Sequence, residues 1–208
     1  MYQWGYLKEA ALAKLDLTED EAAEQNLIEK FPFYANEVIT QVCSAIKPKW
    51  TFAEFVVTDS NLHTKLTMPS DFICFGDDVN LITETEFGIT STRAATDYDF
   101  RYVGYNEVMF FNIGVYRISY NARWIDFNSI EREDDDGVSY TGPIDDSYVI
   151  NVPADILDCI PNYIASQCFK IDDQYKSQVF RNEYEMSLAR IDNTNYKNTK
   201  TFVVGGDW

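Results

Sequence analysis

The order of helical and strand-like segments is the feature that most constrains the fold of this chain. Apolar residues recur at helical spacing over about 4–15 and 19–46 and again over about 153–168 and 172–192, whereas the residues between favour strands and turns. Neither helical pair is long enough to bury its own apolar face. We therefore expect the two pairs to pack on each other and to hold the middle of the chain as an insertion.

The N-terminal pair carries clear start and stop signals. Thr18 followed three residues later by Glu21 is a capping box, which predicts the start of the second helix. Pro32 lacks a backbone N–H and is predicted to kink or divide that helix near Phe31. The helix is predicted to stop at Lys47-Pro48.

The middle of the chain is predicted to form β structure, because runs of aromatic and β-branched residues are separated by turn residues. Met68-Pro-Ser-Asp-Phe72 predicts only a short apolar turn after a Pro and cap-forming residues. We expect a small antiparallel sheet, with acidic or polar loops at about 83–99 and 129–147. The predicted strands cover about 49–58, 100–105, 107–112 and 115–125.

The second helical pair starts at Pro153-Ala-Asp155, and Pro161 predicts a kink in its first helix. Asn193-Thr-Asn195 is the predicted stop of its second helix. The sequence then ends in a largely apolar stretch closed by an aromatic residue, Thr201-Phe-Val-Val-Gly-Gly-Asp-Trp208, that has no core of its own to join. The residues of the last helix expected to face inward are Tyr175, Val179, Phe180, Tyr184, Leu188 and Ile191.

These patterns predict an α+β fold: a discontinuous helical bundle with an inserted antiparallel β region and an extended C-terminal arm. The first part of the helical core is expected over 1–58 and the β-rich insertion over 59–149. The second part of the core is expected over 150–193 and the arm over 194–208.

Composition and charge exclude several classes of protein. The chain of 208 residues is 46% hydrophobic, which indicates a packed globular protein. Its 17 basic and 34 acidic residues give a formal charge of −17, which repels nucleic acid phosphate and anionic lipid. No apolar run approaches eighteen residues, and no leader pattern is present, so we expect a protein made in the cytoplasm without a membrane span.

The residues that carry metal or nucleophilic chemistry are dispersed. Cys43, Cys74, Cys159 and Cys168 form no Cys-x-x-Cys pair, and three of them lie in helical apolar patterns, which predicts buried, reduced thiols. The single histidine, His63, has no nucleophile beside it in a known motif. The acidic run 131–136 fails the EF-hand spacing test, and no phosphate-binding loop occurs. We therefore expect no catalytic residue, no metal site and no cofactor.

Acid pairs leave one enzymatic alternative open. Asp77-Asp78 and Asp172-Asp173 are pairs of adjacent carboxylates. The second pair lies at a predicted helix start, where stabilisation by the helix dipole accounts for acidic residues without a catalytic role. A hydrolase acting on glycan or nucleic acid would draw on carboxylates of the β region, such as Asp97, Asp99 or Asp126.

Several segments in a fixed order resemble the head-to-tail adaptor, or connector, proteins of tailed bacteriophages. The resemblance covers most of the chain and rests on the order of the segments. After the N-terminal helical pair come Leu66-Thr-Met-Pro-Ser-Asp-Phe72, the aromatic β insertion, Ile150-Asn-Val-Pro-Ala-Asp155, Tyr163-Ile-Ala-Ser166 and Asn182-Glu-Tyr184.

The resemblance implies a structural virion protein in the neck, assembled in the host cytoplasm. Such proteins form a ring, usually of twelve copies, below the portal, and they join it to a downstream tail or connector protein. DNA passes through the ring during ejection without specific binding. A tail-completion or other ring protein of the virion is the near alternative. The portal-binding arm is implied to comprise Phe202, Val203, Val204, Gly205, Gly206 and Trp208.

Overall fold

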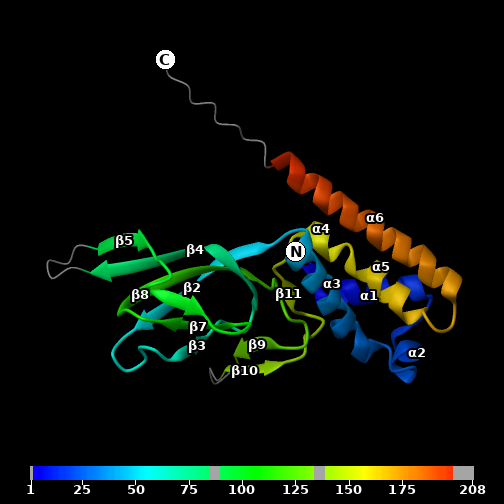
Figure 1. Ribbon diagram of the computed structural model, residues 1–208. Helices are drawn as coiled ribbons and strands as arrows, with labels where there is room; N and C mark the ends of the chain where they lie inside the picture. The colour runs from blue at the N-terminus through cyan, green and yellow to red at the C-terminus, as the bar shows by residue number, and fades with distance from the viewer. Residues whose placement is uncertain (1, 85–89, 134–138, 199–208) are drawn as a thin grey trace, which may run out of the picture. The chain divides into compact units, whose positions relative to one another are not determined.

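A computed structural model describes residues 2–84, 90–133 and 139–198 of the chain (Figure 1). The chain divides into two compact units. The helical unit comprises Met1–Lys47 and Trp124–Trp208, and the β unit comprises Pro48–Arg123. Helices and antiparallel sheets both occur, so the prediction of a mixed α+β protein is confirmed.

The helical unit is built from segments on both sides of the β unit. Before it come α1 (Trp4–Leu15), α2 (Glu19–Glu24), the 3-10 turn η1 (Ile28–Lys30) and α3 (Phe31–Ala45). After it come α4 (Ala154–Leu157), α5 (Ile160–Cys168) and α6 (Gln174–Asn198). Two short antiparallel pairs complete the unit: β1 (Tyr2–Gln3) with β11 (Val149–Ile150), and β9 (Ile130–Glu133) with β10 (Ser139–Gly142).

The predicted boundary signals of the N-terminal helices operate as expected. The Thr18 N–H donates to Glu21 Oε2 at 2.8 Å, and Thr18 Oγ1 accepts from the Glu21 N–H at 3.4 Å. These reciprocal bonds satisfy two backbone donors at the start of α2. Pro32 lies in the first turn of α3, where its missing N–H needs no partner, so the helix is divided near Phe31 as predicted.

The helices from the two ends of the chain share one core. Helix α5 packs against α1, α3 and α6. The Tyr184 hydroxyl on α6 donates to Gln41 Oε1 on α3 at 2.7 Å, which satisfies a polar group on a fully buried side chain. The largest fully buried side chains of this core include Leu7, Phe31, Ile39, Ile160, Ile164 and Tyr184.

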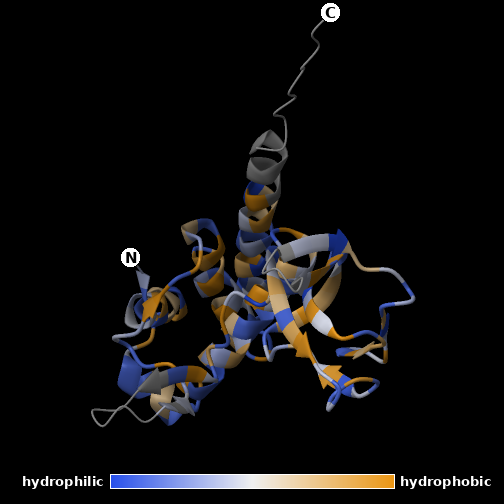
Figure 2. Cartoon of the chain, turned by 90° about the vertical axis from the view of Figure 1, so that its left-hand side faces the viewer, coloured by the Kyte–Doolittle hydropathy of each residue, from blue (hydrophilic) through white to orange (hydrophobic). Residues whose placement is uncertain are grey.

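The β unit consists of two antiparallel sheets. Their strand orders are β2-β8-β4-β5 and β3-β7-β6. Figure 2, coloured by hydropathy, shows strongly apolar stretches along these strands. Aromatic rings fill the core, with the Phe110 and Tyr116 centroids 4.2 Å apart and those of Phe55 and Phe110 5.5 Å apart. The strands are β2 (Lys49–Val57), β3 (Lys65–Thr67), β4 (Phe72–Glu84), β5 (Thr90–Ala94), β6 (Phe100–Tyr102), β7 (Glu107–Phe110) and β8 (Gly114–Ala122).

The structure differs from the sequence-based expectation at several strands. Strand β4 begins at Phe72, where only a short apolar turn was expected. Strands β5, β9 and β10 lie within the segments that were expected to be loops. Strand β2 pairs with β8 along its whole length, which places it in the β unit and not in the first part of the helical core. The observed boundaries, 47/48 and 123/124, therefore differ from the expected 58/59 and 149/150.

Helix α6 differs from its prediction at one face and at its end. Tyr175 is 80% exposed and Val179 is also exposed, whereas Tyr184 and Ile191 are buried. At 3.6 residues per turn, the first two lie on the face of the helix opposite the last two. The helix continues to Asn198, past the predicted stop at 193–195, because Asn and Thr lower helix propensity only modestly and no Gly or Pro intervenes.

Candidate functional site

A bulge in β4 shapes the outer face of the four-stranded sheet. Phe75 pairs with Tyr120 of β8 and Val79 pairs with Ile118, so three residues of β4 lie opposite the single residue Ser119. The Asp78 N–H donates to Ser119 Oγ at 2.9 Å and fixes the bulge on β8. Bulges of this kind re-aim side chains and often occur beside functional sites.

Gly76 allows the bulge to lie close to β8. A Cβ atom at this position would lie 2.3 Å from Ser119 Oγ, which is closer than real contacts permit, and a tight 3.1 Å from the Ser119 carbonyl oxygen. Only glycine fits without a shift of Ser119. The bulge covers Ser119, which is only 7% exposed although it lies on the outer face of the sheet.

Two aromatic side chains of β2 lie beside the bulge. Trp50 and Phe52 occupy alternate positions and therefore share the outer face of the sheet, where they are 57% and 55% exposed. Phe52 is directly opposite Ser119 on β8. A groove of about 240 Å³, here called the sheet groove, is lined by Trp50, Thr51, Phe52, Gly76, Asp77, Asp78 and Ser119.

The sheet groove contains two carboxylates, those of Asp77 and Asp78. Asp77 and Asp78 are exposed, and within the described part of the chain neither has a basic group within 4 Å. The nearby Arg117 of β8 already pairs with Glu54 of β2 at 3.1 Å. The pKa of Tyr102 is raised by burial and by the Asp77 carboxylate. The groove thus combines exposed aromatic rings with two carboxylates that no described basic residue pairs, an arrangement suited to a cation.

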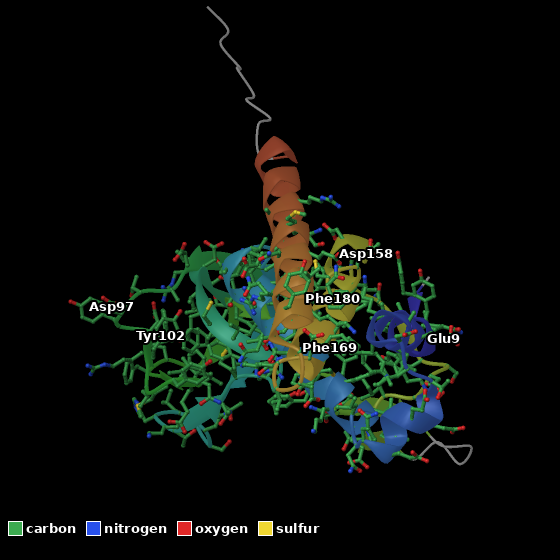
Figure 3. All side chains as sticks on the ribbon, turned by 90° about the vertical axis from the view of Figure 1, so that its right-hand side faces the viewer. Glu9, Asp97, Tyr102, Asp158, Phe169 and Phe180 are labelled. Carbon is green, nitrogen blue, oxygen red and sulfur yellow. The ribbon has the colours of Figure 1, made fainter. Side chains whose placement is uncertain are left out.

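The acids of the enzymatic alternative do not form a pair in either unit. Asp99 is 2% exposed and accepts from both Arg93 guanidinium nitrogens at 2.7 Å. Asp97 is exposed and points away from the β unit (Figure 3). Asp126 belongs to the helical unit, where it accepts from Asn36 Nδ2 at 2.8 Å.

Asp99 has a structural role that its neighbours define. Besides Arg93, it accepts from the Thr96 N–H at 2.8 Å, from Thr96 Oγ1 at 2.9 Å and from Asn112 Nδ2 at 2.9 Å. The Arg93 hydrogen bonds lead the causes that hold the pKa of Asp99 far below its usual range, although burial opposes the shift. A carboxylate with five donors is a poor base.

The thiols lie mostly in the core. Cys43 and Cys159 are buried, Cys168 is partly buried, and Cys74 of β4 is exposed. Burial raises the pKa of Cys159 to about 12 and that of Cys168 to about 11, so these thiols are not nucleophiles at neutral pH. The residues that the structure describes contain no group of three His, Cys, Asp or Glu side chains placed to hold a metal ion.

A second hollow, of about 530 Å³, lies on the helical unit beside α1 and includes Lys8. Lys8 is buried, and its Nζ contacts Glu19 Oε1 at 2.8 Å and Asp146 Oδ2 at 2.5 Å. Burial opposes the charged form, but the two carboxylates outweigh it and raise the pKa of Lys8. The ammonium is thus already neutralised and ties α2 and the loop at Asp146 to α1.

The residues of the implied portal-binding arm lie outside the described residues. Sequence reasoning identified Asp77-Asp78 only as an acid pair and did not identify the groove, although the strand pattern predicted for 49–58 already placed Trp50 and Phe52 on one face. The residues implied to form the arm are Phe202, Val203, Val204, Gly205, Gly206 and Trp208.

Among the described residues, no helix is both long enough and apolar enough to cross a bilayer. Comparison of the chain with protein-family models and with curated protein sequences gives no match.

Proposed function

We propose that this protein is a head-to-tail adaptor of a tailed bacteriophage. In this proposal the chain is a discontinuous helical bundle with an inserted antiparallel β region and an extended C-terminal arm, and it forms a ring below the portal. The observation that carries the proposal is the common core of α1, α3, α5 and α6, which come from opposite sides of the β unit in the sequence. This is the arrangement that the resemblance to connector proteins implies.

The exposed face of α6 supports assembly with other subunits. Tyr175, Val179 and Met186 lie on one face of the helix, and each is exposed. The adjacent Ile171, just before the helix, is 90% exposed. Apolar side chains gathered on one face of an otherwise polar helix are typical of an interaction surface.

The charge of the chain suits a passage for DNA. With a formal charge of −17 per copy, a ring would present little attraction to phosphate. DNA would then move through the lumen without being held by counterion release. The enzymatic alternative gains no comparable support. Asp97 is exposed, and the Asp99 carboxylate is already occupied by hydrogen bonds. Asp126 belongs to the helical unit and not to the β unit.

The test uses the portal protein encoded by the same genome. Mass photometry of the full-length protein with portal should show a complex with a ring of copies, whereas the protein alone should form rings weakly. Added salt should promote ring formation, because it screens the repulsion between copies. If portal leaves the mass distribution unchanged at every salt concentration, the adaptor proposal is wrong.

Two variants test the arm within the same experiment. A chain ending at Lys200 should lose portal binding, and Trp208→Ala should weaken binding by about 2 kcal/mol or more, as is typical for a buried interface tryptophan. Thr201→Ala is the matched control and should change binding by less. Binding that proceeds through a downstream tail protein and not through portal would instead favour the tail-completion alternative.

A further inference from the structure

We infer that the sheet groove binds an arginine or lysine side chain of a partner protein. This goes beyond the adaptor proposal, because the groove lies wholly within the β unit and its chemistry is independent of portal binding or ring formation. The partner is defined by its chemistry: a basic residue presented on an exposed segment.

The groove offers both kinds of contact that a basic side chain uses. The exposed faces of Trp50 and Phe52 can stack on a guanidinium or on the methylenes of lysine. Asp77 and Asp78 form the opposite side of the groove and have no basic group within 4 Å in the described parts of the chain. An incoming cation would therefore gain charge-assisted hydrogen bonds without breaking an existing ion pair.

The same sheet face already accommodates one guanidinium. Arg117 of β8 lies opposite Glu54 of β2, and Arg117 Nη2 contacts Glu54 Oε2 at 3.1 Å. Glu54 and Phe52 are alternate residues of β2, so this ion pair is next to the groove on the same face. The neighbouring position, where the β4 bulge lies opposite Ser119, carries Asp77 and Asp78 without a basic partner among the residues that the structure describes.

Charge decides between a basic protein segment and other occupants. Nucleic acid is disfavoured by the two carboxylates and by the formal charge of −17. An uncharged glycan could stack on Trp50 but would leave both carboxylates without a counter-charge. A basic segment can both stack on the aromatic rings and pair with the carboxylates of the groove. Because β2 is an edge strand of its sheet, an extended segment can also lie alongside β2.

The probe is a blocked Gly-Arg-Gly-Arg-Gly peptide, compared with the same peptide carrying citrulline in place of arginine. Citrulline keeps the shape and removes the charge. Titration calorimetry of the full chain measures affinity, and the NMR shift of the Trp50 indole N–H reports whether the peptide occupies the groove. We expect the arginine peptide to bind at least about tenfold more tightly than the citrulline peptide, as loss of hydrogen bonds to charged groups predicts.

The double variant Asp77→Asn with Asp78→Asn removes both charges and leaves the Asp78 N–H bond to Ser119 intact. Its matched control is Asp59→Asn with Asp97→Asn, which makes the same change of net charge at exposed positions of the same unit. The first pair should weaken binding of the arginine peptide about tenfold and the control pair less than twofold.

Three results would overturn the inference. They are equal affinity for the arginine and citrulline peptides, equal loss in the two double variants, and no shift of the Trp50 indole at saturating peptide. Binding of an uncharged oligosaccharide with a shift of that indole, while the arginine peptide does not bind, would assign the groove to glycan recognition instead.

Discussion

Asp99→Asn should destabilise the β unit strongly, because the Asp99 carboxylate accepts five hydrogen bonds in a buried site. The substitution keeps the side-chain shape but removes the charge and replaces one acceptor oxygen with a donor. That donor would then face Arg93 or Thr96, which also donate. The groups that now bond to the replaced oxygen would be left without an acceptor in a site where Asp99 is 2% exposed.

The magnitude follows from the number and exposure of the partners. Breaking a buried charged pair costs about 3–5 kcal/mol. The Arg93 side chain is 51% exposed, so water can solvate it after the change and the loss lies at the lower end. We therefore expect Asp99→Asn to lower the free energy of unfolding of the β unit by about 3 kcal/mol.

Amide hydrogen exchange measured by mass spectrometry suits this test, because peptides of Pro48–Arg123 report on the β unit separately from the helical unit. The matched control is Asp97→Asn, which lies two residues away at an exposed position and should change stability by less than about 0.5 kcal/mol. If the two variants exchange at the same rate, the hydrogen bonds of Asp99 do not stabilise the unit and the reasoning fails.

The same cluster predicts a pH dependence with a definite sign. The folded-state pKa of Asp99 lies below that of the unfolded chain, which is about 4. Its contribution is therefore fully present above pH 4 or so and is lost as the pH falls toward the folded-state pKa. Between pH 5 and 8 the wild-type chain and Asp99→Asn should differ by a constant amount, and below that the difference should shrink.

Three further substitutions or reactions test local features. Gly76→Ala should destabilise the β unit by about 2 kcal/mol through its clash with the facing strand, whereas Gly142→Ala, where a Cβ meets nothing within 4 Å, should cost less than about 0.5 kcal/mol in urea unfolding. Thr18→Ala should lower the stability of α2 by about 1 kcal/mol, seen as faster amide exchange over Glu19–Glu24, and unchanged exchange there would contradict the capping box. Iodoacetamide at pH 8 should modify Cys74 well before Cys159, whose pKa is raised by burial to about 12, and the reverse order in peptide mapping would refute the burial argument.

Local signals in the sequence were sufficient to predict the N-terminal helices. Helix α1 spans the residues that its apolar spacing indicated, and the Thr18 capping box forms as its pattern requires. Pro32 occupies the first turn of α3 because only there is its missing N–H harmless. Each of these signals acts within a few residues of the chain, so it can be read without knowledge of the tertiary fold.

The missed features depend on contacts between distant segments. Strand β4 does not alternate regularly, because the bulge at Gly76 is set by Ser119, which follows 43 residues later along the chain (119 − 76). The exposed face of α6 was expected to lie in the core because Tyr175 and Val179 are apolar. A 25-residue helix has more than one apolar stripe, however, and only tertiary packing determines which stripe is buried. The sheet groove could not be predicted for the same reason, since its two sides come from strands that meet only through β8.

The points where the chain leaves and re-enters the helical unit are themselves joined. The Trp124 indole N–H donates to the Lys47 carbonyl oxygen at 3.4 Å, and the first register pair of the β unit, Lys49 with Ala122, follows immediately. Tension applied to the two ends of the polypeptide would therefore be carried across the helical unit, and the β unit would remain outside the path of the load. Once that junction opened, β2 and β8 would be pulled apart from their ends, one residue pair at a time, which is the geometry in which antiparallel strands resist force least.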